Sequence, residues 1–379
     1  MKINFFGSTL SASGYAQGNR SMLMEMYRQN IDVSLLHATP PDQNFVIDET
    51  TKSILHEMEI KRFNYDVPTI QRVPGNVVEP RLPGNPSTAY SVFETTRLPS
   101  AWVKTFNKMD AVWTTSKWGK MMFEDSGVLE DVKVVPEGVD IERFNPEKVK
   151  PFPNIKDPDK FTFLFVGLWN KRKGYDVLLD AYLDSFDHDD PVELILKTWI
   201  SGDIEREQWW IQKVISSYAK RKKLKKIPTI KVHTFPVAPE IMPSFYASCD
   251  AFILVSRGEG SGLPVAEAMS MSKPVLVTNS SGQTEFFHVS PKKRPVVLPI
   301  KIERLSKVEE MEHISTDYRH MFWYEPSYED VCIQMKYAFY HPKEGKEMGI
   351  RARKHIMENF TWTHTINRIK ELLSETPKI

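Results

Sequence analysis

One glycine-rich stretch, residues 256–269, constrains the fold more than any other part of this chain. It reads SRGEGSGLPVAEAM and lies between two apolar runs rich in branched side chains, Ala251–Val255 and Pro274–Thr278. Each run has the length of a strand, so the segment predicts a strand, a glycine-rich turn and a helix. The glycines at 258, 260 and 262 allow a sharp turn and close approach of a ligand to the backbone. Pro264 suits the first helical turn, where its missing N–H costs no hydrogen bond.

The same stretch predicts the chemistry of its ligand. A helix that starts near Pro264 points its free N–H groups and the positive end of its dipole at the loop, which favours a phosphate. Two carboxylates bracket this site, Glu259 in the loop and Glu267 in the helix. A carboxylate repels an anion, so we expect both to bind hydroxyl groups instead. Amides for phosphate beside carboxylates for hydroxyls predict a sugar nucleotide.

Length and composition limit the class of protein. A chain of 379 residues suggests two domains, and contents of 41% apolar and 26% charged residues are those of a soluble globular protein. The net charge of +1 gives no reason to expect nucleic acid as a partner. The cysteines, Cys249 and Cys332, are too few for a disulfide framework and fit a reducing compartment. Because Met1–Gly7 is too short for a signal peptide and no apolar run has transmembrane length, we expect a cytoplasmic protein.

Strands alternate with helices in the first half of the chain, which predicts a parallel α/β domain. The predicted strands are 3–6, 31–37, 88–93, 111–115 and 132–135, and the helices are 19–29, 99–109 and 116–125. The glycine-dotted segment 11–18 either approaches a ligand or forms a tight turn. Prolines crowd residues 67–86, which predicts an irregular loop on the acceptor side and neither a helix nor a central strand.

The alternation restarts after a proline-rich linker at residues 144–158. The predicted strands are 162–166, 192–197, 230–234, 251–255 and 274–278. The predicted helices are 174–186, 205–224, 239–248, 328–340, 345–358 and 362–373, besides the one after the glycine-rich turn. Two doubly wound domains bind ligands at the carboxyl ends of their strands, so we expect an active site in a cleft between them.

Several segments in the right order carry a family resemblance. They are EGSGLPVAEAMSMSKPV with its E-x7-E pair, VVPEGVDIERFNP, FLFVGLWNKRKGYDVLLDAY, SFYASCDAFILVSRGEG and FTWTHTINRI. With these motifs the chain resembles glycosyltransferase family 4, the retaining enzymes of the α/β GT-B fold, most strongly over residues 130–285. The resemblance implies two Rossmann-like domains, 1–145 for the acceptor and 146–358 for the nucleotide sugar. It also implies a C-terminal helix, 359–379, that packs back on the first domain.

The resemblance also implies roles for individual residues. Glu259 contacts the donor sugar, Glu267 the ribose, and main chain near Thr234 and Phe235 the base. Lys173 neutralises the leaving diphosphate. The implied donor-binding residues are Gly14, Lys173, Thr234, Phe235, Glu259, Gly260, Ser261, Gly262, Leu263 and Glu267.

Two positions depart from the family pattern. Leu168 stands where relatives usually carry an arginine, so Arg172 is the candidate for the second positive charge. Glu94 stands near the place of a family histidine and either orients the acceptor or a sugar hydroxyl, or caps the helix that starts near Pro99. The implied catalytic residues are therefore Glu259, Lys173, Arg172 and Glu94.

The expected reaction moves a sugar, with retention, from a nucleotide-diphosphate sugar to a hydroxyl of a glycan, lipid or small molecule. We expect no metal and no other cofactor, because lysine, arginine and a helix N-terminus can stabilise the leaving group. The D-x-D sequence Asp187–Asp189 falls on the side opposite the cleft and reads as a charged turn. The family's front-face mechanism follows from the resemblance. The alternatives are a GT-B epimerase or hydrolase, a phosphorylase, which would need a longer chain, and a catalytically silent nucleotide-sugar or glycan-binding protein.

Two surface features leave alternatives open. The basic run Lys220–Lys226 either contacts an anionic membrane or forms a solvated helix end, where cations favour the dipole. The adjacent Trp209 and Trp210 cannot share one helix face, so we expect one in the core and one half exposed. The expected partners are thus a nucleotide-sugar donor and a carbohydrate or lipid-linked acceptor, and peripheral membrane contact through the basic run stays one of two alternatives.

Overall fold

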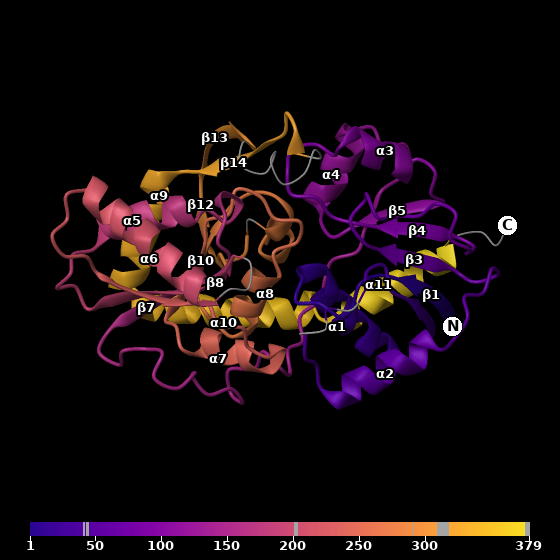
Figure 1. Ribbon diagram of the computed structural model, residues 1–379, viewed down its shortest axis with the longest axis horizontal. Helices are drawn as coiled ribbons and strands as arrows, with labels where there is room; N and C mark the ends of the chain where they lie inside the picture. Colours follow the sequence, from indigo (N-terminus) through magenta and orange to yellow (C-terminus); the bar gives the residue numbers. More distant parts are fainter. Residues whose placement is uncertain (41, 43–44, 201–203, 291, 309–317, 376–379) are drawn as a thin grey trace. The chain divides into compact units, whose positions relative to one another are not determined.

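The computed structural model describes residues 1–40, 42, 45–200, 204–290, 292–308 and 318–375. The chain forms two compact units (Figure 1). Unit 1 comprises Met1–Asp140, Ser315–Met321 and Asn359–Ile379, and unit 2 comprises Ile141–Ile314 and Phe322–Glu358. The contact boundary at Asp140 lies before the proline-rich segment 144–158, and the chain returns to unit 1 at Asn359.

Unit 1 is built on a parallel six-stranded sheet with the order β2-β1-β3-β4-β5-β6. Its strands are β1 (Lys2–Phe6), β2 (Asp32–Leu36), β3 (Thr69–Arg72), β4 (Ser87–Tyr90), β5 (Ala111–Thr114) and β6 (Lys133–Val134). Its helices are α1 (Gly14–Arg28), α2 (Glu49–Glu59), α3 (Ser100–Phe106), α4 (Lys117–Asp125) and α11 (Trp362–Glu375). The predicted parallel α/β organisation of this half is confirmed.

The structure corrects two local predictions in unit 1. The proline-rich segment 67–86 contains the fully buried strand β3, which lies between β1 and β4. Pro68 and Pro74 fall outside β3, so its residues keep the N–H groups that the sheet needs. Helix α1 starts at Gly14, five residues before the predicted start, because the Ser13 side chain accepts a hydrogen bond from the Ala16 N–H and caps it.

Helix α11 completes the hydrophobic core of unit 1. Its side chains Trp362, Ile366, Ile369 and Leu372 are buried in one cluster with residues of β1 and α1. Polar contacts support this packing, because the Thr363 hydroxyl donates to Glu25 of α1 at 2.8 Å. The expected return of the C-terminal helix to the N-terminal domain is confirmed.

Unit 2 has a second parallel six-stranded sheet with the order β12-β11-β10-β7-β8-β9. Its strands are β7 (Phe161–Leu168), β8 (Val192–Trp199), β9 (Thr229–His233), β10 (Ala251–Leu254), β11 (Val275–Thr278) and β12 (Leu298–Ile300), with an antiparallel pair, β13 (Ile302–Lys307) and β14 (Phe322–Pro326), beside it. Its helices are α5 (Tyr175–Ser185), α6 (Ile204–Arg221), α7 (Met242–Ala247), α8 (Leu263–Ser270), α9 (Tyr328–Tyr340) and α10 (Pro342–Asn359). Helix α5 packs against both α6 and α9, and α7 packs against α8 (Figure 1).

None of the helices in the described part of the chain is long and apolar enough to cross a membrane.

Candidate functional site

The topology of unit 2 identifies where a ligand should bind. The central strands β10 and β7 are neighbours in the sheet, although β8 and β9 lie between them in the sequence. The connections from these two strands lead to opposite sides of this pair, so the pair is the switch point of the doubly wound sheet. Ligands of such sheets bind outside the carboxyl ends of the strands at this point. The segments that follow β7 and β10 carry Lys173 and Glu259.

The strongest polar contact at this point joins the two predicted catalytic residues. The Lys173 Nζ donates to Glu259 Oε1 at 2.6 Å, and the two side chains are only 10% and 6% exposed. Arg172 lies beside them, with its Nη1 3.7 Å from the same carboxylate oxygen and 2.8 Å from the Gly258 carbonyl. The structure thus brings together Lys173, Arg172 and Glu259, as predicted from the sequence.

Local structure fixes the lysine in place. Lys173 ends a short 3-10 turn, Lys171–Lys173. The Asn170 side chain caps this turn, because it accepts a hydrogen bond from the Lys173 N–H at 3.0 Å. Gly174 follows with φ of 73° and packs so closely that a Cβ there would lie 2.0 Å from the Val255 carbonyl. Only glycine readily adopts this positive φ and also has no Cβ to clash with the carbonyl. The turn can therefore lie directly against the end of β10.

The charges of the cluster decide the protonation of Glu259. Burial alone would raise the pKa of this carboxyl group. The nearby Lys173 and Arg172 outweigh burial, and the pKa of Glu259 lies below its ordinary value. Glu259 is therefore a carboxylate at neutral pH, suited to accept hydrogen bonds from hydroxyl groups.

The glycine-rich loop leads into α8 as the sequence predicts. Gly262 has φ of 89°, a left-handed conformation that favours glycine, and α8 begins at Leu263 with Pro264 in its first turn. A supporting loop lies behind it, because the Glu259 N–H donates to Ser281 Oγ at 3.0 Å and the Gly282 N–H donates to the Glu259 carbonyl at 2.9 Å. Apart from the glycine at position 282, no feature of the sequence indicates this support.

Glu267 has a partner that sequence reasoning missed. The Tyr246 hydroxyl donates to Glu267 Oε2 at 2.7 Å, and both side chains are buried. Burial and the adjacent carboxylate raise the pKa of Tyr246 well above its ordinary value, so the phenol stays a donor. Tyr246 belongs to the motif SFYASCDAFILVSRGEG, but its spacing alone does not reveal the contact.

The predicted base-binding residues lie at the end of β9. Thr234 is buried, and the Phe235 carbonyl accepts a hydrogen bond from Lys197 Nζ at 2.8 Å. Lys197 lies among aromatic rings, and burial lowers its pKa to about 8. His233 packs edge-on to Phe235, and burial followed by the charges of Lys197 and Lys231 lowers its pKa.

Buried polar atoms without a partner gather near the carboxyl ends of several strands. Within the described residues, no hydrogen-bond partner is present for Trp169 Nε1, His233 Nε2, Thr278 Oγ1 or Ser280 Oγ. These residues lie at or just after the ends of β7, β9 and β11. Buried polar groups are normally paired, so this edge has spare donors and acceptors for a polar ligand. The Trp169 ring itself stacks on Tyr175 at 4.2 Å, which gives it a packing role.

The remaining predicted residues, Gly14 and Glu94, belong to unit 1. The Glu94 carboxylate accepts a hydrogen bond from the Tyr318 hydroxyl at 2.9 Å. Helix α3 begins after Pro99, which makes no side-chain capping hydrogen bond, and the alternative role of Glu94 as a helix cap stays a prediction. Gly14 occupies the first turn of α1, where an added Cβ would meet nothing within 4 Å. The next residue, Tyr15, links this turn to the segment before Glu94 by donating to the Val92 carbonyl at 3.2 Å.

The D-x-D sequence lies on a different edge of unit 2. Asp187 and Asp189 fall in the turn between α5 and the start of β8, at the amino end of that strand. The turn closes on itself, because the Asp187 N–H donates to Asp190 at 2.7 Å and His188 pairs with Asp189. Among the described residues, no group of three or more histidine, cysteine or acidic side chains is placed to hold a metal ion.

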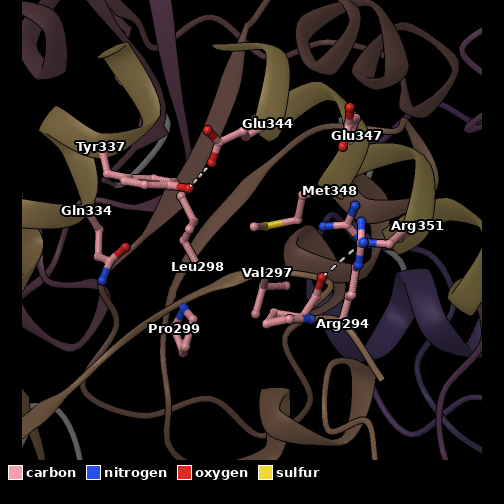
Figure 2. A pocket seen from close by; sticks show the side chains of 11 residues that line it. Arg294, Val297, Leu298, Pro299, Gln334, Tyr337, Glu344, Glu347, Met348 and Arg351 are labelled. Atoms are coloured by element: carbon pink, nitrogen blue, oxygen red, sulfur yellow. Dashed lines mark hydrogen bonds between the residues drawn. The ribbon is translucent and has the colours of Figure 1, made fainter. Parts of the chain in front are cut away.

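A pocket of about 460 Å³ lies elsewhere on unit 2, between β12, α9 and α10 (Figure 2). Its lining mixes opposite charges and shares no residue with the predicted site. The Tyr337 hydroxyl donates to Glu344 across it, and Arg351 donates to the Pro295 carbonyl at 3.3 Å (Figure 2). The lining residues are Arg294, Pro295, Val297, Leu298, Pro299, Gln334, Tyr337, Glu344, Glu347, Met348 and Arg351.

Comparison with known proteins identifies the segment that carries this site. Residues 160–303 match the family model described as "Glycosyl transferases group 1". This segment is therefore similar to the group 1 glycosyltransferases. The match spans β7 to β13 and includes Lys173, Glu259 and Glu267. It confirms the resemblance drawn from the sequence motifs.

Curated relatives are similar over part of their length. A D-inositol 3-phosphate glycosyltransferase of Paenarthrobacter aurescens is 27% identical over 158 residues, which are 41% of this chain and 36% of the relative. An uncharacterized glycosyltransferase of Methanocaldococcus jannaschii is 30% identical over 122 residues, 32% of this chain and 30% of the relative. The match thus spans about a third of the length of each relative.

Solved structures share the fold over nearly the whole chain. Anabaena HepE in complex with UDP and glucose has a TM-score of 0.68 at 15% identity, covering 99% of both chains. Sucrose-phosphate synthase from Thermosynechococcus elongatus has a TM-score of 0.69 at 13% identity, covering 99% of this chain and 98% of the other. At such low identity the likeness shows the fold alone. With two Rossmann-like units, the protein has the GT-B fold that the motifs predicted.

Proposed function

We propose that this protein is a retaining glycosyltransferase that moves a sugar from a nucleotide-diphosphate sugar to a hydroxyl group of an acceptor. The observation that carries the proposal is the buried Lys173–Glu259 pair. It lies at the switch point of unit 2, beside a glycine loop and a helix N-terminus, within the segment that matches the group 1 glycosyltransferases. These are the groups that a leaving diphosphate and a donor sugar require.

Donor binding should rearrange the charges of this cluster. Without a donor, Glu259 is the anion next to Lys173 at 2.6 Å. A diphosphate would take over the lysine, assisted by Arg172 and by the amides of residues 261–263 at the start of α8. Glu259 would then be released to accept hydrogen bonds from hydroxyls of the sugar, and Glu267 would bind the ribose.

We propose the following step. The bond between the anomeric carbon and the leaving oxygen breaks, and its electron pair stays on the diphosphate, where Lys173 and Arg172 stabilise it. The acceptor oxygen forms its bond to the same face of the anomeric carbon. Its proton passes to the leaving phosphate oxygen, so charge and atoms balance and the configuration is retained. No metal enters this proposal, because the fixed positive charges do the work of a cation.

We propose uridine diphosphate sugars as the first donors to test and a carbohydrate, or a carbohydrate carried on a lipid, as the acceptor. Anabaena HepE, which shares the fold, was solved with UDP and glucose. In unit 1, Glu94 is the candidate that orients the acceptor hydroxyl. We place the reaction in the cytoplasm, in line with two free cysteines.

The test is transfer or hydrolysis with a panel of UDP-, GDP- and ADP-sugars, with the anomeric configuration of the product read by NMR. We expect Lys173→Ala and Glu259→Gln each to lower turnover by roughly 10²–10³, the usual cost of losing one group that stabilises the transition state. The control is Lys171→Ala, an exposed lysine of the same turn, which should keep wild-type turnover.

Different outcomes separate the alternatives. Wild-type turnover in both site variants would refute the proposed site. An altered sugar nucleotide or free sugar as the only product, with every acceptor, would indicate an epimerase or hydrolase. Nucleotide binding without any turnover would indicate a silent binding protein. Strict dependence on added Mn²⁺ would refute the metal-free step.

A further inference from the structure

Helix α6 and the turn after it carry an unusual concentration of positive charge. Residues 206–226 contain one carboxylate, Glu207, and this side chain is buried at 3% exposure. The positively charged side chains of the same segment are Arg206, Lys213, Lys220, Arg221, Lys222, Lys223, Lys225 and Lys226. Since the chain as a whole has a net charge of only +1, this surface is a local feature of α6.

The same helix exposes two large aromatic side chains. Trp209 is 58% exposed and Trp210 is 52% exposed, so the expectation that one of them packs in the core is wrong. The reason is the helical period, because the buried residues Glu207, Ile211 and Ile215 repeat every four positions and define the inner face. Trp209 and Trp210 therefore lie away from this inner face, and neither side chain is part of the hydrophobic core.

The charges and the tryptophans occur together on the exposed side of the helix. Lys213 lies over the ring of Trp209 at 5.4 Å. Arg206, Trp210, Lys213 and Lys220 are spaced four, three and seven residues apart, so they lie along one exposed face. Among the cations, Arg221 and Lys222 pair with Asp180 and Asp184 of the neighbouring α5, which anchors the end of α6 to unit 2. Lys223, Lys225 and Lys226 follow these anchoring residues in the sequence.

Exposed tryptophans among lysines and arginines match the surface of an anionic bilayer. Tryptophan prefers the interface between headgroups and acyl chains, where its ring is in an apolar region and its N–H is hydrated. Lysine stems also bury their methylene groups there while the ammonium group meets lipid phosphate. An anionic polymer such as a nucleic acid would account for the cations, but not for two outward tryptophans whose apolar area needs a partner.

We propose that α6 is a membrane-docking surface, made of Trp209, Trp210, Lys213 and Lys220 with Lys223, Lys225 and Lys226, that binds anionic lipid bilayers. This surface shares no residue with the proposed transferase site, and the proposal does not depend on that site. The protein would be held at the membrane by the outer face of α6, in the plane of the interface.

The experiment is sedimentation of the full chain with vesicles of phosphatidylcholine containing phosphatidylglycerol, and with vesicles of phosphatidylcholine alone. The wild type should bind the anionic vesicles and not the neutral ones, and salt should weaken binding. Each neutralised cation in Lys220→Gln and Lys223→Gln should weaken partitioning roughly fivefold. Trp209→Ala with Trp210→Ala should lose most of the binding. Tyr340→Ala, which removes an exposed aromatic ring from α9, is the matched control and should bind like the wild type.

Unchanged binding in the double tryptophan variant, or equal binding to neutral vesicles, would overturn the proposal. Loss of self-association by that variant, seen by light scattering without vesicles, would also overturn it and make α6 an interface between copies. Thermal unfolding tests whether the double variant is folded. Because both tryptophans are exposed, the variant should unfold at the wild-type temperature.

Discussion

At the scale of single residues, the buried contact between Lys173 and Glu259 carries a cost in hydration free energy. Two charges that leave water lose hydration, and their mutual attraction only partly compensates, so such pairs contribute little net stability. Arg172 adds a second positive charge 3.7 Å from the same carboxylate. Two positive side chains thus lie next to one buried carboxylate, at the place where we propose that a diphosphate binds. This arrangement is a reason to assign the cluster to binding and catalysis rather than to the stability of unit 2.

Tyr246 is predicted to position Glu267 for the ribose, which rests on the proposed function. Tyr246→Phe removes the hydroxyl that donates to Glu267 Oε2 at 2.7 Å and should cost about 1–2 kcal/mol of affinity for UDP. Calorimetry with UDP and 2′-deoxy-UDP measures the effect. The wild type should prefer UDP, and the variant should lose most of this preference.

Tyr182→Phe is the matched control for that experiment. Its hydroxyl also makes one buried hydrogen bond in unit 2, to the Thr229 carbonyl at 2.8 Å, but it does not contact Glu267. It should lower stability and leave the preference for UDP unchanged. A Tyr246→Phe variant that keeps the full preference would show that Tyr246 serves only packing, whereas a wild type that binds no nucleotide would contradict the proposed function itself.

Lys197 should make stability depend on pH in the alkaline range. Burial lowers its pKa to about 8 in the folded state, from 10.5 as the ordinary value. Between these two values the unfolded chain holds a proton that the folded chain has released, so stability from this group rises with pH. Below pH 8 both states are protonated and the slope vanishes. Urea unfolding measures the free energy of unfolding of the wild type and of Lys197→Met. As pH rises from 8 towards 10.5, this free energy should increase for the wild type relative to the variant. A constant difference across this range would contradict the assignment.

At the scale of elements, the glycine-rich loop depends on a second loop for its shape. Gly282 packs against it so closely that a Cβ would lie 2.0 Å from the Gly260 carbonyl and 2.9 Å from the Glu259 carbonyl. Gly282→Ala should therefore displace the loop and destabilise unit 2 by about 1–3 kcal/mol, with loss of nucleotide affinity. Denaturant unfolding and UDP calorimetry measure the two effects.

Gly14→Ala is the matched control for Gly282→Ala, because it makes the same substitution at another glycine. An added Cβ at Gly14 meets nothing within 4 Å, so its stability should stay within about 0.5 kcal/mol of the wild type. If this variant nevertheless loses transfer activity, the first turn of α1 needs close approach of a ligand, as the family resemblance implies for Gly14. Equal stability of Gly282→Ala and the wild type would contradict the role given to the supporting loop.

At the scale of the whole molecule, the end of the chain stabilises its beginning. Ile366 of α11 is fully buried in a cluster with β1 and α1 of unit 1. Ile366→Ala should destabilise unit 1 by about 2–5 kcal/mol and leave unit 2 unaffected. Limited proteolysis on a heating series should show cleavage within residues 1–140 at lower temperature than in the wild type. The control is Ile350→Ala on α10, whose side chain is 58% exposed and which should change neither unit.

Much of the site was predictable because its signals are local. Gly258, Gly260, Gly262 and Pro264 form one short segment that predicts a strand, a turn and a helix start, and the structure places β10 and α8 there. Glu259 and Glu267 are positioned by that segment. The strands that alternate with helices likewise predict parallel sheets, because each element has its own apolar pattern.

Long-range partners were not predictable. Tyr246 meets Glu267 through the packing of α7 on α8, and Tyr318 reaches Glu94 from 224 positions away. Strand β3 was missed because nearby prolines suggest a loop, whereas the sheet decides by pairing Thr69–Arg72 between β1 and β4.

The sequence alone thus determined the glycine loop, its two acids and the family resemblance, since these depend on residues next to one another. Only the tertiary structure decided that Glu259 pairs with Lys173, 86 positions away, and that Trp209 and Trp210 both face outward. A contact across the sheet depends on strand order, and an exposed face depends on what packs behind it. Neither property is encoded in the order of neighbouring residues.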